Sequence, residues 1–589
     1  MHQSSLRVSV FVFFILALAG CGGGGSGSVA EQPDSDNPIF SVSEFNPNWA
    51  HVGVFEPAST CAGCHQSDGS IMQYSGEDVS ASTQWRHTVM AHSFNDPYWQ
   101  AAVEDEAATF PDLAGLIEDK CTSCHAPMAH KHAHQNGSGL DAGGHFRLSA
   151  AASQGHAREG ISCTLCHQIQ DDGNLGTAAS FSGGFSIDPS AQDIYGPYAS
   201  PAGNNMLNQT GYTPVYGSHT SESALCATCH TLYTDILDAD TGLPTGDMFL
   251  EQAPYLEWRA SDFFTGNVNE KQCQACHMPE PDTGYSTQIA TRPGTLAART
   301  PFMQHLFLGG NTHLLQMLAE YRSELGISNS TTEEDFEQQE EYNRSFLEDQ
   351  TAELALSANL SGTTLTADVE ITNKTGHKLP SSYPSRRMWL HITVTDKNGL
   401  IAFESGKPDA QGRISTDTAR LQSSCMALDK PAGFNSEACY EPHRNLIQRE
   451  SEVAIFETVL GDTNNTITHT LLRAAGYLKD NRIPPSGFTN SKADAIEAQI
   501  KASGVSGDTD FNCIGTVEGC GKDTVRYEVD VTTYTGPFDI EAKLYYQSIQ
   551  PAFVDGLHSS GPLVNRFKAM YQAVPPTVEE LASEEMQVI

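Results

Sequence analysis

The stretch SALCATCHTL, residues 223–232, contains two cysteines separated by two residues and followed at once by a histidine, His230. The same C-x-x-C-H pattern recurs as CAGCH (61–65), CTSCH (121–125), CTLCH (163–167) and CQACH (273–277). Zinc sites need paired CxxC units or returning histidine spacings, and thioredoxin-like motifs need no following histidine. Five copies of this pattern are therefore typical of a chain that attaches c-type haem.

Each motif supplies the complete local chemistry of covalent haem attachment. The two cysteines form thioethers with the haem, and the adjacent histidine is then held beneath the iron as its proximal ligand. The predicted thioether residues are Cys61, Cys64, Cys121, Cys124, Cys163, Cys166, Cys226, Cys229, Cys273 and Cys276. The predicted proximal ligands are His65, His125, His167, His230 and His277. The sequence thus predicts five covalently attached haem c groups.

The chain has 15 cysteines, so five lie outside these motifs. Four of them are in the second half, at Cys425, Cys439, Cys513 and Cys520. In an oxidising compartment they predict two disulfides, and loop length favours Cys425–Cys439 and Cys513–Cys520 over the other pairings, which stay open.

The fifth cysteine, Cys21, ends the segment LAGC (18–21), which follows Arg7 and the apolar run 8–19. This resembles the lipobox of bacterial lipoproteins, with Cys21 as the lipidated residue; an ordinary secretory signal with an accidental cysteine is the alternative. The flexible stretch GGGGSGS follows at 22–28, as expected for a tether. By this resemblance we expect an exported protein, lipid-anchored at the outer membrane and facing the periplasm or the cell surface.

Acidic residues outnumber basic residues by 72 to 33 across 589 residues, giving a formal net charge of −39. This balance argues against nucleic acid or an anionic membrane surface as a partner. It suits a solvated extracytoplasmic protein or a cationic partner, and we expect redox partner proteins or an external electron acceptor.

The pattern along the chain predicts an α+β multidomain protein. Residues 1–20 form the signal peptide, 21–56 the anchor and tether, and 57–325 a loop-rich, mainly helical pentahaem domain. Helical spacing appears within 96–120 and at 313–326, and an acidic helical connector is predicted within 326–350. From residue 351 to 589 the period changes to two, for example at Met388, Leu390, Ile392 and Val394. Several such strands with Gly/Asn turns predict an antiparallel β-sandwich.

Six stretches together resemble multihaem cytochromes of the cytochrome c-554 (c552/4) type. They are TQWRHTVMAHSFNDPYW (83–99), EGISCTLCHQI (159–169), SALCATCHTL (223–232), CQACHMPEP (273–281), HLFLGGN (305–311) and NKTGHKLPSSYPSRRMWL (373–390). The resemblance implies an exported electron-transfer protein with closely stacked haems, many of which have a second histidine on the iron. One departure concerns the family pattern W-x-x-S-x-H-A, because Met90 stands where a histidine is usual. Either Met90 or His92 is therefore a candidate distal ligand.

Further distal candidates follow from the same resemblance. His377 matches a Gly-His corner that would let the β-domain reach a haem edge, and His219 and His305 also match the family. The alternating histidines in HKHAH (130–134) are typical of a metal cluster or of a solvated loop. One of His130, His132 and His134 is a candidate from this group, with His145 and His156 as competitors.

A calcium site is a further expectation. Asp508 and Asp510 in GDTDFNC are two nearby carboxylates, whereas calcium takes about six or more oxygens. Two carboxylates alone therefore do not define a site.

Three functions fit this sequence. The leading hypothesis is a non-catalytic carrier that transfers electrons along a chain of five haems at the cell envelope. The second is a multihaem reductase or oxidase of a small nitrogen or sulfur compound, with one haem open to substrate. The third is a subunit of a cytochrome polymer or of an outer-membrane conduit. No catalytic residue is assigned.

Overall fold

The computed structural model describes residues 49–512 and 517–589, except for 329, 382, 432 and 577. The signal peptide, Cys21 and the tether lie outside the described residues, so their predicted roles stay predictions. Among the described residues, no helix combines the length and the apolar character needed to cross a membrane.

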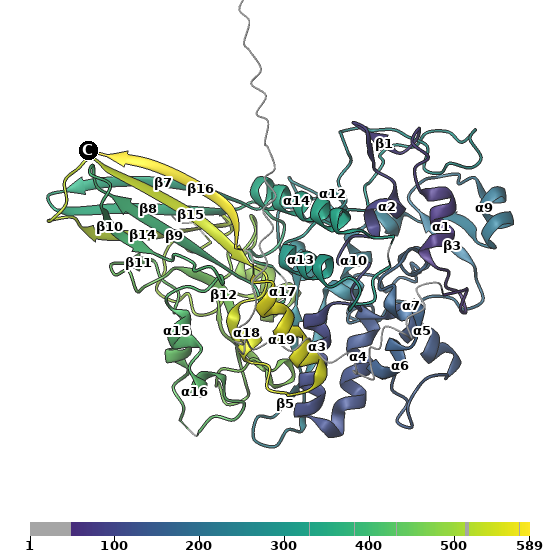
Figure 1. Ribbon diagram of the computed structural model, residues 1–589, viewed down its shortest axis with the longest axis horizontal. Helices are drawn as coiled ribbons and strands as arrows, with labels where there is room; N and C mark the ends of the chain where they lie inside the picture. Colours follow the sequence, from purple (N-terminus) through teal and green to yellow (C-terminus); the bar gives the residue numbers. More distant parts are fainter. Residues whose placement is uncertain (1–48, 329, 382, 432, 513–516, 577) are drawn as a thin grey trace, which may run out of the picture.

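The first half of the described chain consists of short helices linked by long loops, as the sequence predicts (Figure 1). The stretch with helical spacing in 96–120 forms two helices, α3 (Pro97–Thr109) and α4 (Ala114–His125). Asp96 begins α3, because its side chain accepts hydrogen bonds from the backbone N–H groups of Tyr98 and Trp99. Pro111 interrupts the helical path between the two helices, since proline lacks the N–H that a continuing helix needs.

The remaining elements of this half are brief. The helices are α1 (Ala58–His65), α2 (Ala81–Trp85), α5 (Pro127–Asn136), α6 (Leu148–Ala152), α7 (Gly155–Arg158), α8 (Cys163–Cys166), α9 (Gly203–Thr210), α10 (Ser223–His230), α11 (Pro254–Arg259) and α12 (Cys273–His277). The strands form three small pairs, β1 (Gln73–Tyr74) with β2 (Glu77–Asp78), β3 (Asp193–Gly196) with β4 (Thr213–Tyr216), and β5 (Leu232–Leu237) with β6 (Pro244–Gln252).

Two further helices lead from this half to the sheets. Helix α13 (Thr312–Glu320) is shorter than the helix predicted at 313–326. After Glu320 the chain continues in turns and reaches Gly326 in a left-handed conformation. Helix α14 (Glu333–Gln350) begins with a capping box, in which Thr332 and Asp335 each bind the other's backbone N–H. It is more than a solvated connector, since Phe336 and Leu347 are buried.

The second half is built around two packed sheets, as predicted. One consists of β13 (Gly476–Asp480), β12 (Ile455–Gly461), β9 (Arg387–Thr395), β15 (Phe538–Gln547) and β16 (Glu579–Val588) in this order, with β10 (Ile401–Ser405) paired to β9. The other consists of β11 (Leu446–Ile447), β14 (Lys522–Asp530), β8 (Thr364–Asn373) and β7 (Ala352–Ser361). All pairs are antiparallel except the short pair of β11 with β14.

The alternating residues of these strands form the sandwich core. Val369 faces Val525 across β8 and β14, and Leu390 faces Leu544 across β9 and β15. All four side chains are fully buried. The polar residues between them lie on the outer faces, which is the arrangement that a period of two produces in a strand.

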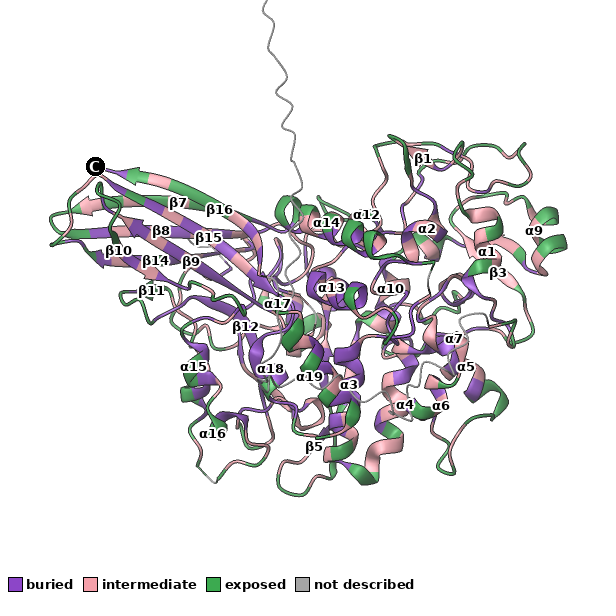
Figure 2. Ribbon diagram, in the orientation of Figure 1, coloured by how far each residue is buried: buried purple, intermediate pink, exposed green. Residues whose placement is uncertain are grey.

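The second half also contains helices that the alternation did not predict. They are α15 (Asp417–Arg420), α16 (Ser423–Met426), α17 (Asn490–Ile496), α18 (Pro551–Asp555) and α19 (Pro562–Ala573). Helix α19 packs on α3 of the first half, as Figure 1 shows. One hydrophobic cluster joins Leu315 and Phe336 to Phe553 and Phe567. In Figure 2, α3 and α13 of the first half and α18 of the second half are largely purple. The two halves therefore share a core.

Candidate haem-binding sites

Each C-x-x-C-H motif lies on one turn of helix or at a helix end. The motifs end α1, α4 and α10, form α12, and form α8 with His167 directly after it. Residues three apart lie on the same face of a helix, so the two cysteines of each motif project together. This local geometry suits two thioethers to one haem with the histidine next to them.

Cysteines from different motifs lie beside one another. The interacting thiol pairs are Cys61–Cys163, Cys124–Cys229 and Cys226–Cys273, and in each pair the interaction lowers the pKa of one thiol and raises that of the other. The fourth motif thus adjoins the second and the fifth, and the first adjoins the third. Cys166 of the third motif also raises the pKa of Cys226 and Cys229. All five motifs therefore belong to one cluster.

Four of the five motif histidines make the same hydrogen bond to the backbone. Their Nδ1 atoms bind backbone carbonyls, His65 to Ile289 (2.7 Å), His125 to Ser93 (2.9 Å), His167 to Tyr195 (2.7 Å) and His277 to Leu308 (2.6 Å). A carbonyl can only accept, so each Nδ1 carries the proton and each Nε2 keeps its lone pair. This is the tautomer and orientation that a metal ligand needs.

Burial keeps these histidines neutral. Desolvation lowers the pKa of His125 and of His230 to about 4, and it also lowers the pKa of His65, His167 and His277. A neutral imidazole is the form that binds a metal ion. The residues therefore fit haem iron on their chemistry as well as on their spacing.

His377, from the loop before β9, lies opposite the motif histidine His277. Their ring centroids are 6.3 Å apart and their planes differ by 19°. Two imidazoles on opposite sides of one metal ion would have this spacing, since two metal–nitrogen bonds of about 2 Å and about 1 Å within each ring add up to about 6 Å. His377 Nδ1 is occupied by the Lys378 carbonyl at 3.0 Å, so its Nε2 is the nitrogen left for a metal.

A second pair has nearly the same geometry. His305 lies opposite the motif histidine His167, with centroids 6.4 Å apart and planes 22° apart. Burial lowers the pKa of His305 to about 3. The side-chain carbonyl of Gln84 accepts a hydrogen bond from the His305 backbone N–H at 3.0 Å, which helps to hold the loop in place.

Buried charges position the His377 loop against the first half. The Lys378 N–H donates to Glu257 of α11 at 3.0 Å, and Lys378 Nζ lies 2.6 Å from Asp480. Arg482 bridges Asp480 (2.8 Å) and Glu257 (3.1 Å). The β-half thus reaches the haem-binding half through a buried ion network next to His377.

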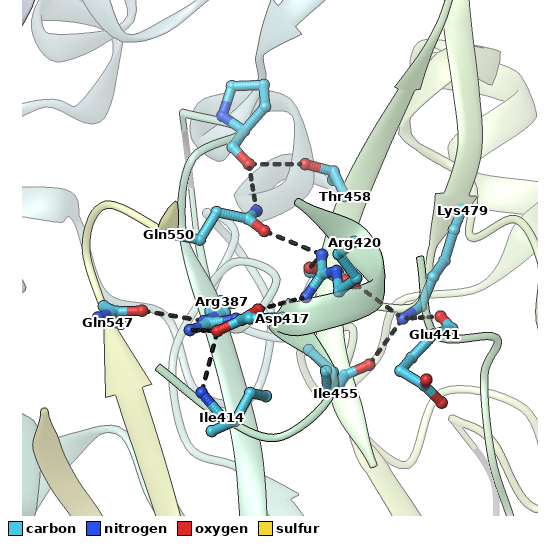
Figure 3. Close-up of polar contacts among 12 residues, drawn as sticks. Arg387, Ile414, Asp417, Arg420, Glu441, Ile455, Thr458, Lys479, Gln547 and Gln550 are labelled. Carbon is cyan, nitrogen blue, oxygen red and sulfur yellow. Dashed lines mark hydrogen bonds and ion pairs between the residues drawn. The ribbon is translucent and has the colours of Figure 1, made fainter. Parts of the chain in front are cut away.

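Arg387, ten residues after His377, belongs to a different network. It makes two contacts with Asp417 at 2.7 and 2.9 Å and one with Gln547. Figure 3 shows this network, which continues through Arg420, inside the β-half. Arg387 is fully buried there, so it stabilises the sandwich.

The other distal candidates have mixed surroundings. His219 is buried with its Nε2 bound to the Ile169 carbonyl at 2.9 Å, beside an open cavity of about 430 Å³. His92 is buried with its Nε2 on the Arg86 carbonyl at 2.8 Å, and its Nδ1 has no partner in the described part of the chain. Met90 is half-buried, and its carbonyl accepts from the Ile161 N–H.

Among the distal candidates His134, His145 and His156, the first two face carboxylates. His134 Nε2 lies 2.7 Å from Asp119, and His145 Nδ1 lies 3.6 Å from Asp141. His156 differs, because it is buried and its Nε2 has no partner among the described residues. Of the three, His156 is the one with a ring nitrogen available in the interior.

Sequence reasoning did not single out His87. This residue is 5% exposed, burial lowers its pKa to about 4, and its Nδ1 has no partner within the described ranges. Its only sequence signal is its position two residues after Trp85, within the stretch that resembles the cytochromes. It joins His92 and His156 as a buried histidine with an unoccupied nitrogen.

The Cys425 and Cys439 sulfur atoms form a disulfide. Cys513 lies outside the described residues, so its pairing with Cys520 stays a prediction.

Comparisons with known proteins add little. No family model matches the sequence, and no curated protein shows a significant match. Among solved structures, a penta-heme cytochrome c552 from Thermochromatium tepidum is similar with a TM-score of 0.47 and 14% identity, covering 91% of this chain and 100% of that one. The resemblance to the c-554 type therefore stays a prediction, and the functional argument rests on the motif geometry.

Proposed function

We propose that this chain is an exported pentahaem cytochrome that carries electrons along a row of closely spaced haems. The five attachment motifs support this, because they form one cluster in which each motif adjoins another. Haem held by these residues would supply an iron centre that can be reduced and reoxidised. The chain's own contribution is to hold the five sites close together and to bury their ligands.

The observation that carries the proposal is the pairing of motif histidines with histidines from distant loops. His277 with His377, and His167 with His305, have the spacing and the near-parallel planes of two ligands on one metal ion. A metal closed on both sides by imidazole offers no position for a substrate. These two sites therefore suit electron transfer rather than catalysis.

The sixth ligands at His65, His125 and His230 are less defined. We infer that they come from the buried histidines with an unoccupied nitrogen, His87, His92 and His156, or from His219 and Met90. A reductase would need one of these sites to remain open beside a cavity.

Two variants test the proposal. His377→Ala and His305→Ala should each retain all five haems, measured by intact mass, and each should convert one haem from low-spin to high-spin, measured by absorbance and electron paramagnetic resonance. His391→Ala is the matched control, since His391 lies in β9 and contacts Glu404 at 3.3 Å. Spectra unchanged from wild type in both test variants would refute the ligand pairs.

Carbon monoxide and nitrite separate the carrier from the reductase. A carrier closed at every iron should bind little of either after full reduction. Rapid binding at one haem, together with reduction of nitrite by the protein when a reduced dye supplies electrons, would refute the carrier hypothesis and support the reductase hypothesis. Particles that lengthen with protein concentration in electron micrographs would instead favour the polymer subunit.

A further inference from the structure

Asp523 breaks the pattern of its strand. In β14 the residues that face the sandwich core are Asp523, Val525, Tyr527 and Val529. Asp523 is 1% exposed, and neither of its carboxylate oxygens has a hydrogen-bond partner within the described part of the chain. Burying a carboxyl group without a hydrogen-bond partner is costly, and burial raises the pKa of Asp523 well above its usual value. Such a break in pattern indicates a site where something else supplies the missing contacts.

Two more carboxylates lie beside Asp523. A ligand oxygen of Asp508, one of Asp523 and a ring nitrogen of His443 all lie within 4.8 Å of one another. Asp510 interacts with the Asp508 side chain and adds to the negative field at Asp523. Among the described residues, no lysine or arginine forms an ion pair with any of the three.

The hydrogen bonds of His443 decide which kind of cation fits. Asn481 accepts from the Glu457 N–H at 3.0 Å and donates to the Ile455 carbonyl at 2.9 Å. Its amide orientation is therefore fixed, and its NH₂ group donates to His443 Nδ1 at 3.1 Å. With Nδ1 accepting, Nε2 carries the proton.

His443 Nε2 then donates that proton to Asp508 Oδ2 at 2.7 Å. A nitrogen that carries a proton cannot bind a metal, so His443 is a positioning residue. Asp508 Oδ1 accepts from the backbone N–H groups of Asp510 (2.9 Å) and Phe511 (3.1 Å). Asp508 is thus held with the remaining lone pair of Oδ2 available, and the set of possible ligands contains only oxygen.

We propose that Asp508, Asp510 and Asp523 bind one calcium ion, with His443 orienting Asp508. Hard cations prefer such carboxylate ligands, and calcium tolerates an irregular set completed by water to about six to eight oxygens. The ion would tie the 508–512 segment to the end of β14. Its binding does not depend on the proposed electron-transfer function.

The test uses the full-length haem-loaded protein after removal of metal with a chelator. Isothermal titration with CaCl₂, together with calorimetric melting with and without about 1 mM Ca²⁺, should show one site and a higher melting temperature. Asp523→Asn should weaken calcium binding at least tenfold. Without calcium, this variant should melt no lower than wild type, because the Asp523 carboxylate makes no hydrogen bond in the described part of the chain that the substitution could remove. Glu528→Gln, the same charge change on the outer face of β14, should bind calcium like wild type.

Three results would overturn the proposal. The first is no calcium bound by wild type at about 1 mM, which would mean that the carboxylates share protons instead. The second is unchanged affinity in Asp523→Asn. The third is tighter binding of Zn²⁺ than of Ca²⁺, lost in His443→Gln, which would make His443 a ligand. If Asp523→Asn does not fold, slower hydrogen exchange of residues 508–512 in wild type on adding calcium is expected, and unchanged exchange would count against the site. Haem content and spectra of Asp523→Asn should match wild type, which separates this proposal from the previous one.

Discussion

Asp480 lies in the buried ion network that joins the two halves: it holds Lys378 and Arg482 of the β-half, and these two residues contact Glu257 of the first half. Asp480→Asn removes the carboxylate that holds both cations. Its carboxylate contacts Lys378 Nζ at 2.6 Å and Arg482 at 2.8 Å, and both Lys378 and Asp480 have fully buried side chains. The substitution leaves two buried cations with Glu257 as the nearby carboxylate. Because Lys378 follows His377, the damage should reach the proposed ligand as well as the fold.

The expected loss is large because the pair is buried. Removing one partner of a buried ion pair costs about 3–5 kcal/mol. For a unit the size of the β-half, each kcal/mol lowers the melting temperature by about 2–4 °C, so we expect a drop of about 6–20 °C. Scanning calorimetry of the haem-loaded protein measures this drop, and absorbance spectra report whether a low-spin haem is lost with it.

The stabilisation that Asp480 contributes should decrease as the pH is lowered. Burial alone would raise the pKa of Asp480, but Arg482 and Lys378 outweigh burial and lower it to about 2. A lowered carboxylate pKa stabilises the folded state at pH values above the unfolded pKa, and the stabilisation is lost as pH falls through the folded pKa. The gap between wild type and variant should therefore be constant from about pH 5 to 8 and narrow only below about pH 4.

Asp368→Asn is the matched control. Asp368 makes two contacts with Arg526 at 2.7 and 3.0 Å, yet that arginine side chain is 54% exposed. An exposed pair contributes at most about 1 kcal/mol. If Asp480→Asn lowers the melting temperature no more than Asp368→Asn does, burial does not strengthen the junction and our account of it is wrong.

Three further predictions concern other parts of the chain. Replacing Cys425 and Cys439 by serine opens a loop with a sequence separation of 14 and should destabilise the protein by about 3 kcal/mol in calorimetry; reductant should lower the melting temperature of wild type by more than that of the variant, which retains only the predicted Cys513–Cys520 disulfide. Glu106 accepts a hydrogen bond from the Leu471 N–H, and burial raises its pKa to about 8. The protonated carboxyl therefore stabilises the folded state fully below about pH 4.5, and this stabilisation is lost as pH rises through 8. The free energy of unfolding should fall by at most about 1.4 kcal/mol per pH unit across this range. Denaturant titrations across this range should show that decline in wild type and a flatter profile in Glu106→Gln, and parallel profiles would contradict it. Cys21→Ser should release the protein from membranes in cell fractionation, whereas continued membrane association would exclude the lipid anchor.

The attachment motifs could be predicted from the sequence because their chemistry is local. Two cysteines and a histidine within five residues need only one turn of helix, and the structure places each motif on such a turn. The strands could be predicted for a similar reason, since alternation such as that from Met388 to Val394 directly determines which side chains a strand buries.

Which side chains meet across the molecule was decided by the tertiary structure alone. His277 meets His377, and His443 meets Asp523, although the members of each pair are far apart in the chain. Family resemblance suggested His377 as a ligand without identifying its partner, and the buried His87 had no signal that sequence reasoning used. These contacts depend on how the two halves pack around their shared core. The free energy of that packing comes from contacts among residues distant in sequence, so a local sequence pattern does not predict which side chains come together.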